Sequence, residues 1–165
     1  MIPLRRNFRQ FLTPIGKFSL ESRVLSTVLL VTAFLGFMDS AYLTFEKLNN
    51  SIPPCSLVDG CEKVLTSPYS SVYGVPLSAF GALFYLCVFV LVFVIRESPN
   101  PRWFQLLWLL ANFGFIFSLM LLYIQIAVIS SYCFYCLLSI LTSSIIFSVV
   151  THWYGHLRQP RTVRS

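Results

Sequence analysis

The chain has 165 residues, of which 56% are hydrophobic and only 11% are charged. Water-soluble domains carry roughly 25% charged residues, so this composition indicates a protein whose main solvent is the lipid bilayer. The net charge of +6 does not indicate nucleic-acid binding, because the basic residues stand at the ends of apolar segments and form no polar stripe.

The apolar segments predict four transmembrane helices. The first runs over residues 24–48 and the second over about 75–95. After a polar break at 96–102, residues 103–154 stay apolar over a length that suits two spans of roughly 20 to 25 residues. A turn between these two spans is expected near residues 129–132. The predicted fold is therefore an all-α integral membrane bundle of four transmembrane helices.

The basic residues predict the orientation of the bundle. A basic N-terminal segment (1–23) precedes the four-helix membrane domain (24–154), and a basic tail (155–165) follows it. Both ends and the 96–102 break share one side of a four-span protein. Basic residues accumulate on the cytoplasmic side, so both termini are expected there, and the long loop of residues 49–74 between helices 1 and 2 is expected outside. Ten of the twelve basic residues agree: Arg5, Arg6, Arg9, Lys17, Arg23, Arg96, Arg102, Arg158, Arg161 and Arg164.

Four of the five cysteines then fall on the outer side. Cys55 and Cys61 belong to the outer loop and have an Asp-Gly turn signal between them. Cys133 and Cys136 form a CxxC motif at the outer start of the fourth span. Disulfides persist on an oxidising face, and the loop is long enough to fold back over the bundle. The two pairs therefore predict a relay by thiol–disulfide exchange.

The CxxC spacing gives its two cysteines different expected roles. Residues i and i+3 share a helix face, and the free N–H groups of a first turn favour the reactive thiolate. Cys136 lies one turn deeper than Cys133, about 4 to 5 Å at 1.5 Å per residue. Cys136 is therefore better placed to meet an electron acceptor dissolved in the lipid, and Cys133 to exchange with the loop pair.

Roles without redox chemistry stay open for the cysteines at this point. The four could form two structural disulfides in a non-enzymatic membrane subunit, or a tetrahedral zinc site, although no histidine stands near them. Cys87, midway through the second span, is expected to be an inert packing residue. A transporter is a further alternative, against which stand the short loops and the few ionisable groups inside the spans.

The sequence resembles the vitamin K epoxide reductase family from the first span to the fourth. The resemblance is carried by Cys55, by CEKVLTSPY at residues 61–69, by YGVPLSAFG at residues 73–81 and by the late CxxC. Each piece alone is a weak signal, whereas the combination is specific. The sequence looks most similar to the bacterial and cyanobacterial members.

The resemblance implies a role for each matching residue. Cys55 would form a mixed disulfide with a partner thiol, and Cys61 would resolve it and then exchange with Cys133. Cys136 would reduce a quinone. Ser67 matches a serine or threonine position near the quinone, where a hydroxyl can hydrogen-bond a carbonyl. Without the resemblance, Ser67 could equally be a helix-capping or turn residue.

The resemblance also implies the substrate and the partner. The electron acceptor would be a membrane quinone, with no metal and no flavin needed. Many bacterial relatives carry a fused thioredoxin-like domain, which is not expected in this chain. A separate thioredoxin-like protein on the extracytoplasmic side, or such a domain in a longer form of the protein, is expected as the partner, and no nucleic acid. The expected location is a bacterial inner membrane or a thylakoid membrane.

Two departures from the animal members bear on the reaction. Five residues separate Cys55 from Cys61, fewer than in those members, and Leu77 stands where they have an asparagine. Quinone reduction coupled to disulfide formation is therefore favoured over epoxide reduction. A DsbB-type disulfide-generating enzyme is an alternative, but it normally places its CxxC in the first outer loop.

Three polar residues inside the spans are further candidates. Asp39, in the outer half of the first span, is a functional candidate by default. It is expected either to hydrogen-bond within the bundle mouth or to take part in proton release. Asn112 and Gln125 in the third span are expected to form hydrogen bonds between helices.

Overall fold

A computed structural model of the chain describes residues 15–49, 51 and 61–158. Within these residues, four helices are long and apolar enough to cross a membrane. The helices are α1 (Ile15–Leu48), α3 (Leu77–Glu97), α4 (Pro101–Tyr123) and α5 (Phe134–Arg158). The predicted four-helix architecture is confirmed. The first helix begins at Ile15, earlier than the apolar span alone indicated.

The third span ends in an irregular turn. α4 begins after Asn100, whose side chain accepts a hydrogen bond from the backbone N–H of Arg102. It continues directly into η3 (Ile124–Ile129), a π-helical turn, so the span as a whole reaches residue 129. Ser130 then adopts a left-handed conformation, with φ of 52°, and the chain reverses into α5. The reversal falls where the sequence predicted it.

The four helices pack through small residues and buried hydroxyl groups. A Cβ placed on Gly36 of α1 would lie 2.4 Å from the ring of Tyr85 on α3, so only glycine allows this approach. The Tyr85 hydroxyl contacts α5, 2.8 Å from the Ser139 carbonyl oxygen and 2.7 Å from Thr142 Oγ1. Such close backbone contacts and interhelical hydroxyl bonds are how helices associate in lipid.

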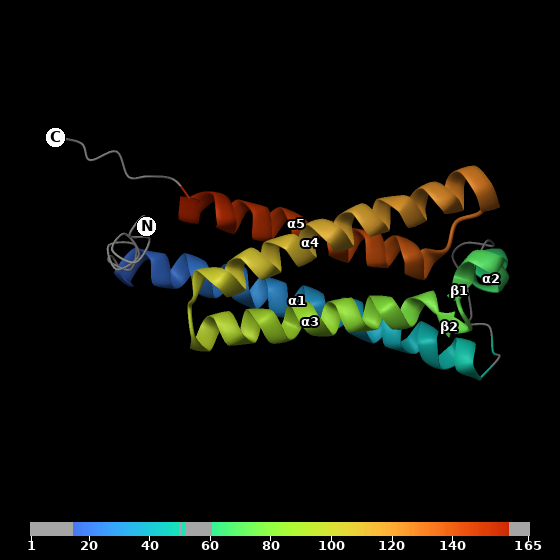
Figure 1. Cartoon of the computed structure of the whole chain (residues 1–165), viewed down its shortest axis with the longest axis horizontal. Helices are drawn as coiled ribbons and strands as arrows, with labels where there is room; N and C mark the ends of the chain where they lie inside the picture. The colour runs from blue at the N-terminus through green and yellow to red at the C-terminus, as the bar shows by residue number, and fades with distance from the viewer. Residues whose placement is uncertain (1–14, 50, 52–60, 159–165) are drawn as a thin grey trace, which may run out of the picture.

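The segment between α1 and α3 closes one end of the bundle. Its described part contains α2 (Cys61–Thr66), the 3-10 turn η2 (Pro68–Ser70) and a short antiparallel pair of strands, β1 (Ser71–Val72) and β2 (Val75–Pro76). Residues 52–60 of the predicted outer loop lie outside the described residues, so the loop as a whole remains a prediction. Figure 1 shows α2 and both strands at the end where η3 turns into α5.

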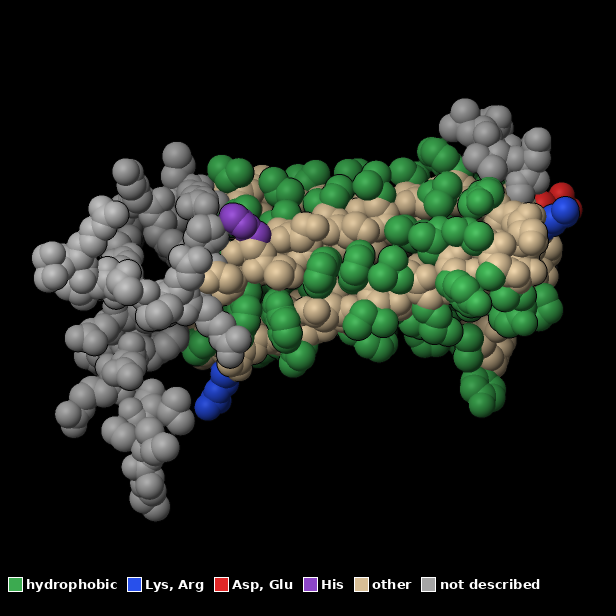
Figure 2. All heavy atoms as spheres, turned by 90° about the horizontal axis from the view of Figure 1, so that it is seen from above, with side chains coloured by type: hydrophobic (Ala, Val, Ile, Leu, Met, Phe, Trp, Pro, Cys, Tyr) green, Lys and Arg blue, Asp and Glu red, His purple; other side chains and the backbone are tan. Residues whose placement is uncertain are grey.

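The opposite end holds the start of α1, the connection from α3 to α4 and the end of α5 (Figure 1). Along the face seen in Figure 2, apolar side chains cover the length of the bundle, and the described charged side chains lie near its two ends. Large hydrophobic side chains such as Phe113 and Leu109 are more than half exposed. This distribution is expected when lipid, and not water, surrounds the helices.

The two expected interhelical amides behave differently. Gln125 is buried, and its side-chain oxygen accepts a hydrogen bond from the backbone N–H of Cys133, so it joins the end of the third span to the start of the fourth. Asn112 instead donates to the Trp108 carbonyl oxygen, one turn earlier on its own helix. The Asn112 amide is therefore engaged within α4, and this bond is not the interhelical one that the sequence predicted.

Candidate functional site

Cys61 and Cys133 lie in one buried cluster at the α2 end of the bundle. Both side chains have an exposed fraction of 0%, and they pack with Val64 into a small apolar core that Ile129 and Cys136 border. The apolar residues of α2 point toward the start of α5, which seats this short helix on the bundle. The loop cysteine and the CxxC motif, 72 positions apart in sequence, are thus brought together.

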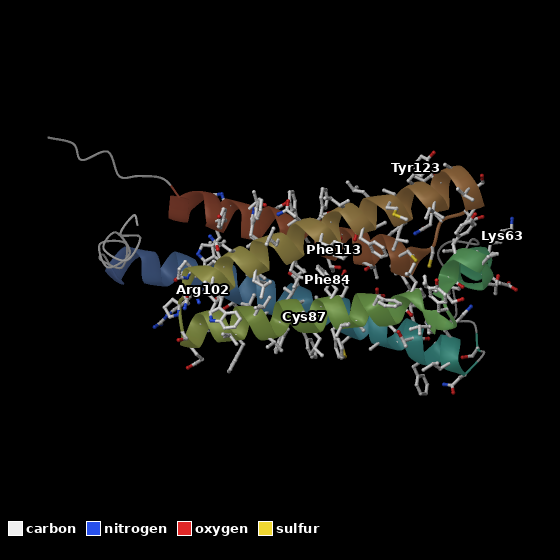
Figure 3. The ribbon with its side chains drawn as sticks, in the orientation of Figure 1. Lys63, Phe84, Cys87, Arg102, Phe113 and Tyr123 are labelled. Atoms are coloured by element: carbon white, nitrogen blue, oxygen red, sulfur yellow. The ribbon has the colours of Figure 1, made fainter. Side chains whose placement is uncertain are left out.

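The cysteines of the site differ in redox state. Cys61 is disulfide-bonded, whereas Cys133 and Cys136 carry free thiols. Cys55 lies outside the described residues, so its predicted place in the relay is not tested. Cys87 is a free thiol midway along α3 (Figure 3), and its side chain is exposed on the surface of the bundle, whereas the sequence predicted a packing residue.

Cys133 occupies the position just before the first turn of α5. A side-chain hydrogen bond from Cys136, helped by backbone N–H groups of Cys136 and Tyr135, lowers the pKa of Cys133 to about 7, against the opposing effect of burial. These are the otherwise unsatisfied donors of a helix start, which stabilise a thiolate. The structure therefore favours the thiolate form of Cys133, the first cysteine of the CxxC motif.

Gln125 fixes the backbone of this motif from the other side of the turn. Its side-chain oxygen lies 3.3 Å from the Cys133 nitrogen, and its own carbonyl accepts a bond of 3.1 Å from the Ser131 N–H. The π-helical turn brings Gln125 into this position, since an added residue in a helical turn rotates the side chains that follow it. The residue was expected only to bond between helices, and its place beside the CxxC motif could not be read from the sequence.

A cavity of about 420 Å³ lies beside the thiol pair. All four long helices contribute to its wall, and α2, η2 and the strands cover its end. Its wall is mostly apolar and rich in aromatic rings, including Phe84 of α3 and Phe113 of α4, which Figure 3 labels near the middle of the bundle. The size and lining suit a flat apolar ligand held by a few polar groups.

The cavity wall includes Cys136 and Ser67. Ser67 stands at the residue before η2, but its hydroxyl makes no capping bond and donates to the Val64 carbonyl oxygen at 2.7 Å. Its oxygen keeps lone pairs that can accept a further hydrogen bond. Two residues that the sequence selected from segments about 70 positions apart thus line the same cavity.

Two charged residues also line this cavity, both on α1. Lys47 donates to the Leu65 carbonyl oxygen at 2.6 Å and to Ser70 Oγ at 3.1 Å, so it ties the end of α1 to α2 and η2. Asp39 lies two turns deeper, and its Oδ2 atom is buried without a hydrogen-bond partner among the described residues. Within that same part of the chain, no group of three or more His, Cys, Asp or Glu side chains is arranged to hold a metal ion.

The fold and the site define a class: a four-helix membrane protein with a thiol pair at one end, next to a largely apolar cavity. The model of the vitamin K epoxide reductase family matches residues 27–151, most of the chain. The chain belongs to this family, whose members are oxidoreductases. The family in general suggests a membrane thiol–quinone oxidoreductase.

Proposed function

We propose that this protein oxidises the thiols of a secreted thioredoxin-like partner and passes the electrons to a membrane quinone, and so drives disulfide formation. The observation that carries the proposal is a continuous path. Cys61 shares a buried cluster with Cys133, and Cys136, one helical turn further, lines the apolar cavity. An electron pair that enters through the loop pair would therefore pass from Cys61 to Cys133 and then to Cys136 on the cavity wall.

In the proposed relay, the partner's dithiol first reduces the Cys55–Cys61 disulfide through a mixed disulfide on Cys55. The Cys61 thiolate then attacks Cys133 of an oxidised CxxC pair, which releases Cys136. Cys55 next attacks Cys61, the loop disulfide reforms, and Cys133 is released. Each exchange breaks one S–S bond and forms another, so the electron pair moves without loss.

Quinone reduction completes the cycle. The Cys136 thiolate adds to the quinone ring, and the Cys133 thiolate attacks the Cys136 sulfur, which closes the Cys133–Cys136 disulfide and leaves the electron pair on the ring. The quinone takes up two electrons and two protons and leaves as hydroquinone. The low pKa of Cys133 supports this order, since a thiolate is the attacking species. Ser67 would accept a hydrogen bond from a hydroxyl of the hydroquinone, or donate to a quinone carbonyl after rotation.

The free thiols of Cys133 and Cys136 favour this relay over the alternative of a non-enzymatic subunit held by two structural disulfides. The positive-inside pattern supports a cytoplasmic location for both termini and an extracytoplasmic location for α2 and the CxxC motif. A bacterial inner membrane or a thylakoid membrane would suit this arrangement. Leu77 lines the cavity as an apolar residue, which supports plain quinone reduction over epoxide reduction.

The test is quinone reduction by the purified protein in detergent, with a reduced thioredoxin-like donor. Wild type should turn over, and Cys136→Ala should lose essentially all activity, because no thiol remains on the cavity wall. Cys87→Ala is the matched control and should keep full activity. Equal rates for wild type and Cys136→Ala, or no reduction of any common quinone by wild type, would exclude the relay.

A further inference from the structure

Asp39 lines the cavity, but the proposed relay assigns it no role. It lies on one face of α1 with Leu43 and Lys47, and all three line the cavity. Among the described residues on that wall it is the acidic one. Cys136 lines the same cavity, and the charge of Asp39 is the least of the influences on the Cys133 and Cys136 thiols.

The surroundings of this carboxyl group leave one oxygen unsatisfied. Asp39 Oδ2 is buried and has no hydrogen-bond partner in the described part of the chain. The expectation that Asp39 bonds within the bundle mouth is therefore not met at this atom. The hydroxyl of Tyr85, which lines the same cavity, is engaged with Ser139 and Thr142 on α5.

An unpartnered carboxyl group inside a membrane bundle is costly. A buried polar group without a hydrogen bond destabilises the fold, and an ionised one does so more strongly. The cavity is where a partner could enter, because Asp39 lies on its wall. A quinone offers carbonyl oxygens, which accept a hydrogen bond from a protonated carboxyl, and a hydroquinone offers hydroxyl groups, which donate to a carboxylate. A carboxyl group that alternates between its protonated and ionised forms can therefore hydrogen-bond both the quinone and the hydroquinone.

We propose that Asp39 is a catalytic residue that carries one proton from the Cys136 thiol to a quinone oxygen. This proposal rests on the proposed quinone reduction. The Asp39 carboxylate takes the proton of Cys136, which leaves the thiolate that adds to the ring. The protonated Asp39 then gives that proton to the oxygen on which negative charge develops, and returns to the carboxylate. The second proton of the hydroquinone comes from outer water, to which Cys133 releases its own proton, so protons and electrons balance.

The proposal separates two half-reactions that can be measured apart. Exchange between the loop pair and the CxxC motif needs no quinone and should proceed at the wild-type rate in Asp39→Asn. Quinone reduction by the fully reduced protein, followed in a single turnover, should slow by about 100-fold or more, the usual contribution of a general acid–base group. Glu46→Gln, an acid on the same helix that does not line the cavity, is the matched control and should leave both rates unchanged.

Equal single-turnover rates in wild type and Asp39→Asn would overturn this role and leave the relay intact, whereas failure of wild type to reduce any quinone would overturn the relay itself. Slowing of both half-reactions together would mark Asp39 as structural. Should Asp39→Asn not fold, infrared difference spectra of Asp39→Glu and wild type decide the matter. A carboxyl band that changes on quinone reduction and shifts in Asp39→Glu supports the proton transfer, and its absence overturns it.

Discussion

At the scale of single residues, Cys133 is contacted by groups on both sides of the turn between η3 and α5. Cys136 and the first N–H groups of α5 stabilise its thiolate, while Gln125 holds the Cys133 N–H from η3. A buried sulfur would otherwise stay protonated, since burial disfavours the charged form. The Cys136 thiol and the backbone N–H groups at the start of α5 together lower the pKa of this buried cysteine to about 7.

The acidity of Cys133 can be measured directly. Its pKa of about 7 lies below its usual range, so the thiolate should form as the pH rises through 7, two units earlier than for an unperturbed thiol with a pKa of 9.0. The ultraviolet absorbance of the thiolate, titrated with the CxxC pair reduced, should show this step in Cys87→Ala and lose it in the double variant with Cys133→Ser. A first step near pH 9 in both proteins would contradict the assignment.

Replacing Gln125 should affect Cys133 indirectly, through the hydrogen bond to its backbone N–H. Gln125→Leu keeps the size of the side chain but leaves the Cys133 N–H without its acceptor, a loss of about 1–3 kcal/mol when such a group stays buried. The start of α5 should loosen, and exchange between Cys61 and Cys133 should slow about tenfold. Asn112→Leu is the control, because that amide bonds within its own helix. Equal slowing in both variants would show a general packing defect.

At the scale of elements, a side chain at the end of α1 helps to hold α2 and η2 in place. Lys47, at the end of α1, donates to the carbonyl of Leu65 and the hydroxyl of Ser70 and so positions the segment that carries Cys61 and Ser67. The sequence indicated that the loop could reach the bundle, but long-range bonds from a lysine side chain leave no local pattern. How the segment docks could therefore not be predicted.

Lys47→Met should weaken this docking. A hydrogen bond from a charged donor is worth about 1.5–3 kcal/mol, and about 1.4 kcal/mol corresponds to a factor of ten, so transfer from the loop pair to the CxxC motif should fall about tenfold. Single-turnover quinone reduction by the reduced CxxC pair should change less. Lys63→Met, on the exposed side of α2, provides the control and should transfer at the wild-type rate.

The contact between α1 and α3 yields a stability prediction. Gly36→Ala would place a Cβ 2.4 Å from the Tyr85 ring, and the hydroxyl bonds of Tyr85 to α5 prevent the ring from moving aside. Overpacking of this kind costs about 1–3 kcal/mol. Gly155→Ala, in α5 with open space around it, should be neutral or slightly stabilising. The measurement is thermal unfolding in detergent, where a Gly36→Ala variant as stable as Gly155→Ala would contradict the packing described.

At the scale of the whole molecule, most of the fold could be predicted from composition, because the length of an apolar run sets whether it spans the membrane. The four spans and the turn after Ile129 follow from this rule. The candidate site could be predicted in part. The CxxC spacing selected Cys133 and Cys136, whereas only the family resemblance selected Ser67. The cavity depends on side chains from every long helix, and the role of η3 depends on an irregular backbone. Neither is encoded in a local pattern of residues.

The orientation remains a prediction and has a direct test. Lys63 on α2 and Arg102 at the start of α4 lie at opposite ends of the bundle (Figure 3). In a background with its cysteines replaced by serine, Lys63→Cys should react with a membrane-impermeant maleimide added to intact cells, and Arg102→Cys should react only after the membrane is opened. The reverse pattern would place the CxxC motif in the cytoplasm.

The position of the cavity at one end of the bundle has a mechanical consequence. The length of the apolar helices sets how deep the Cys133 and Cys136 sulfurs lie below the membrane surface. A bilayer thinner than the bundle would lift the cavity toward the headgroups and water, while a thicker one would draw α2 toward the acyl chains. Lipid thickness would then influence how readily a water-soluble protein and a lipid-dissolved oxidant meet at this site.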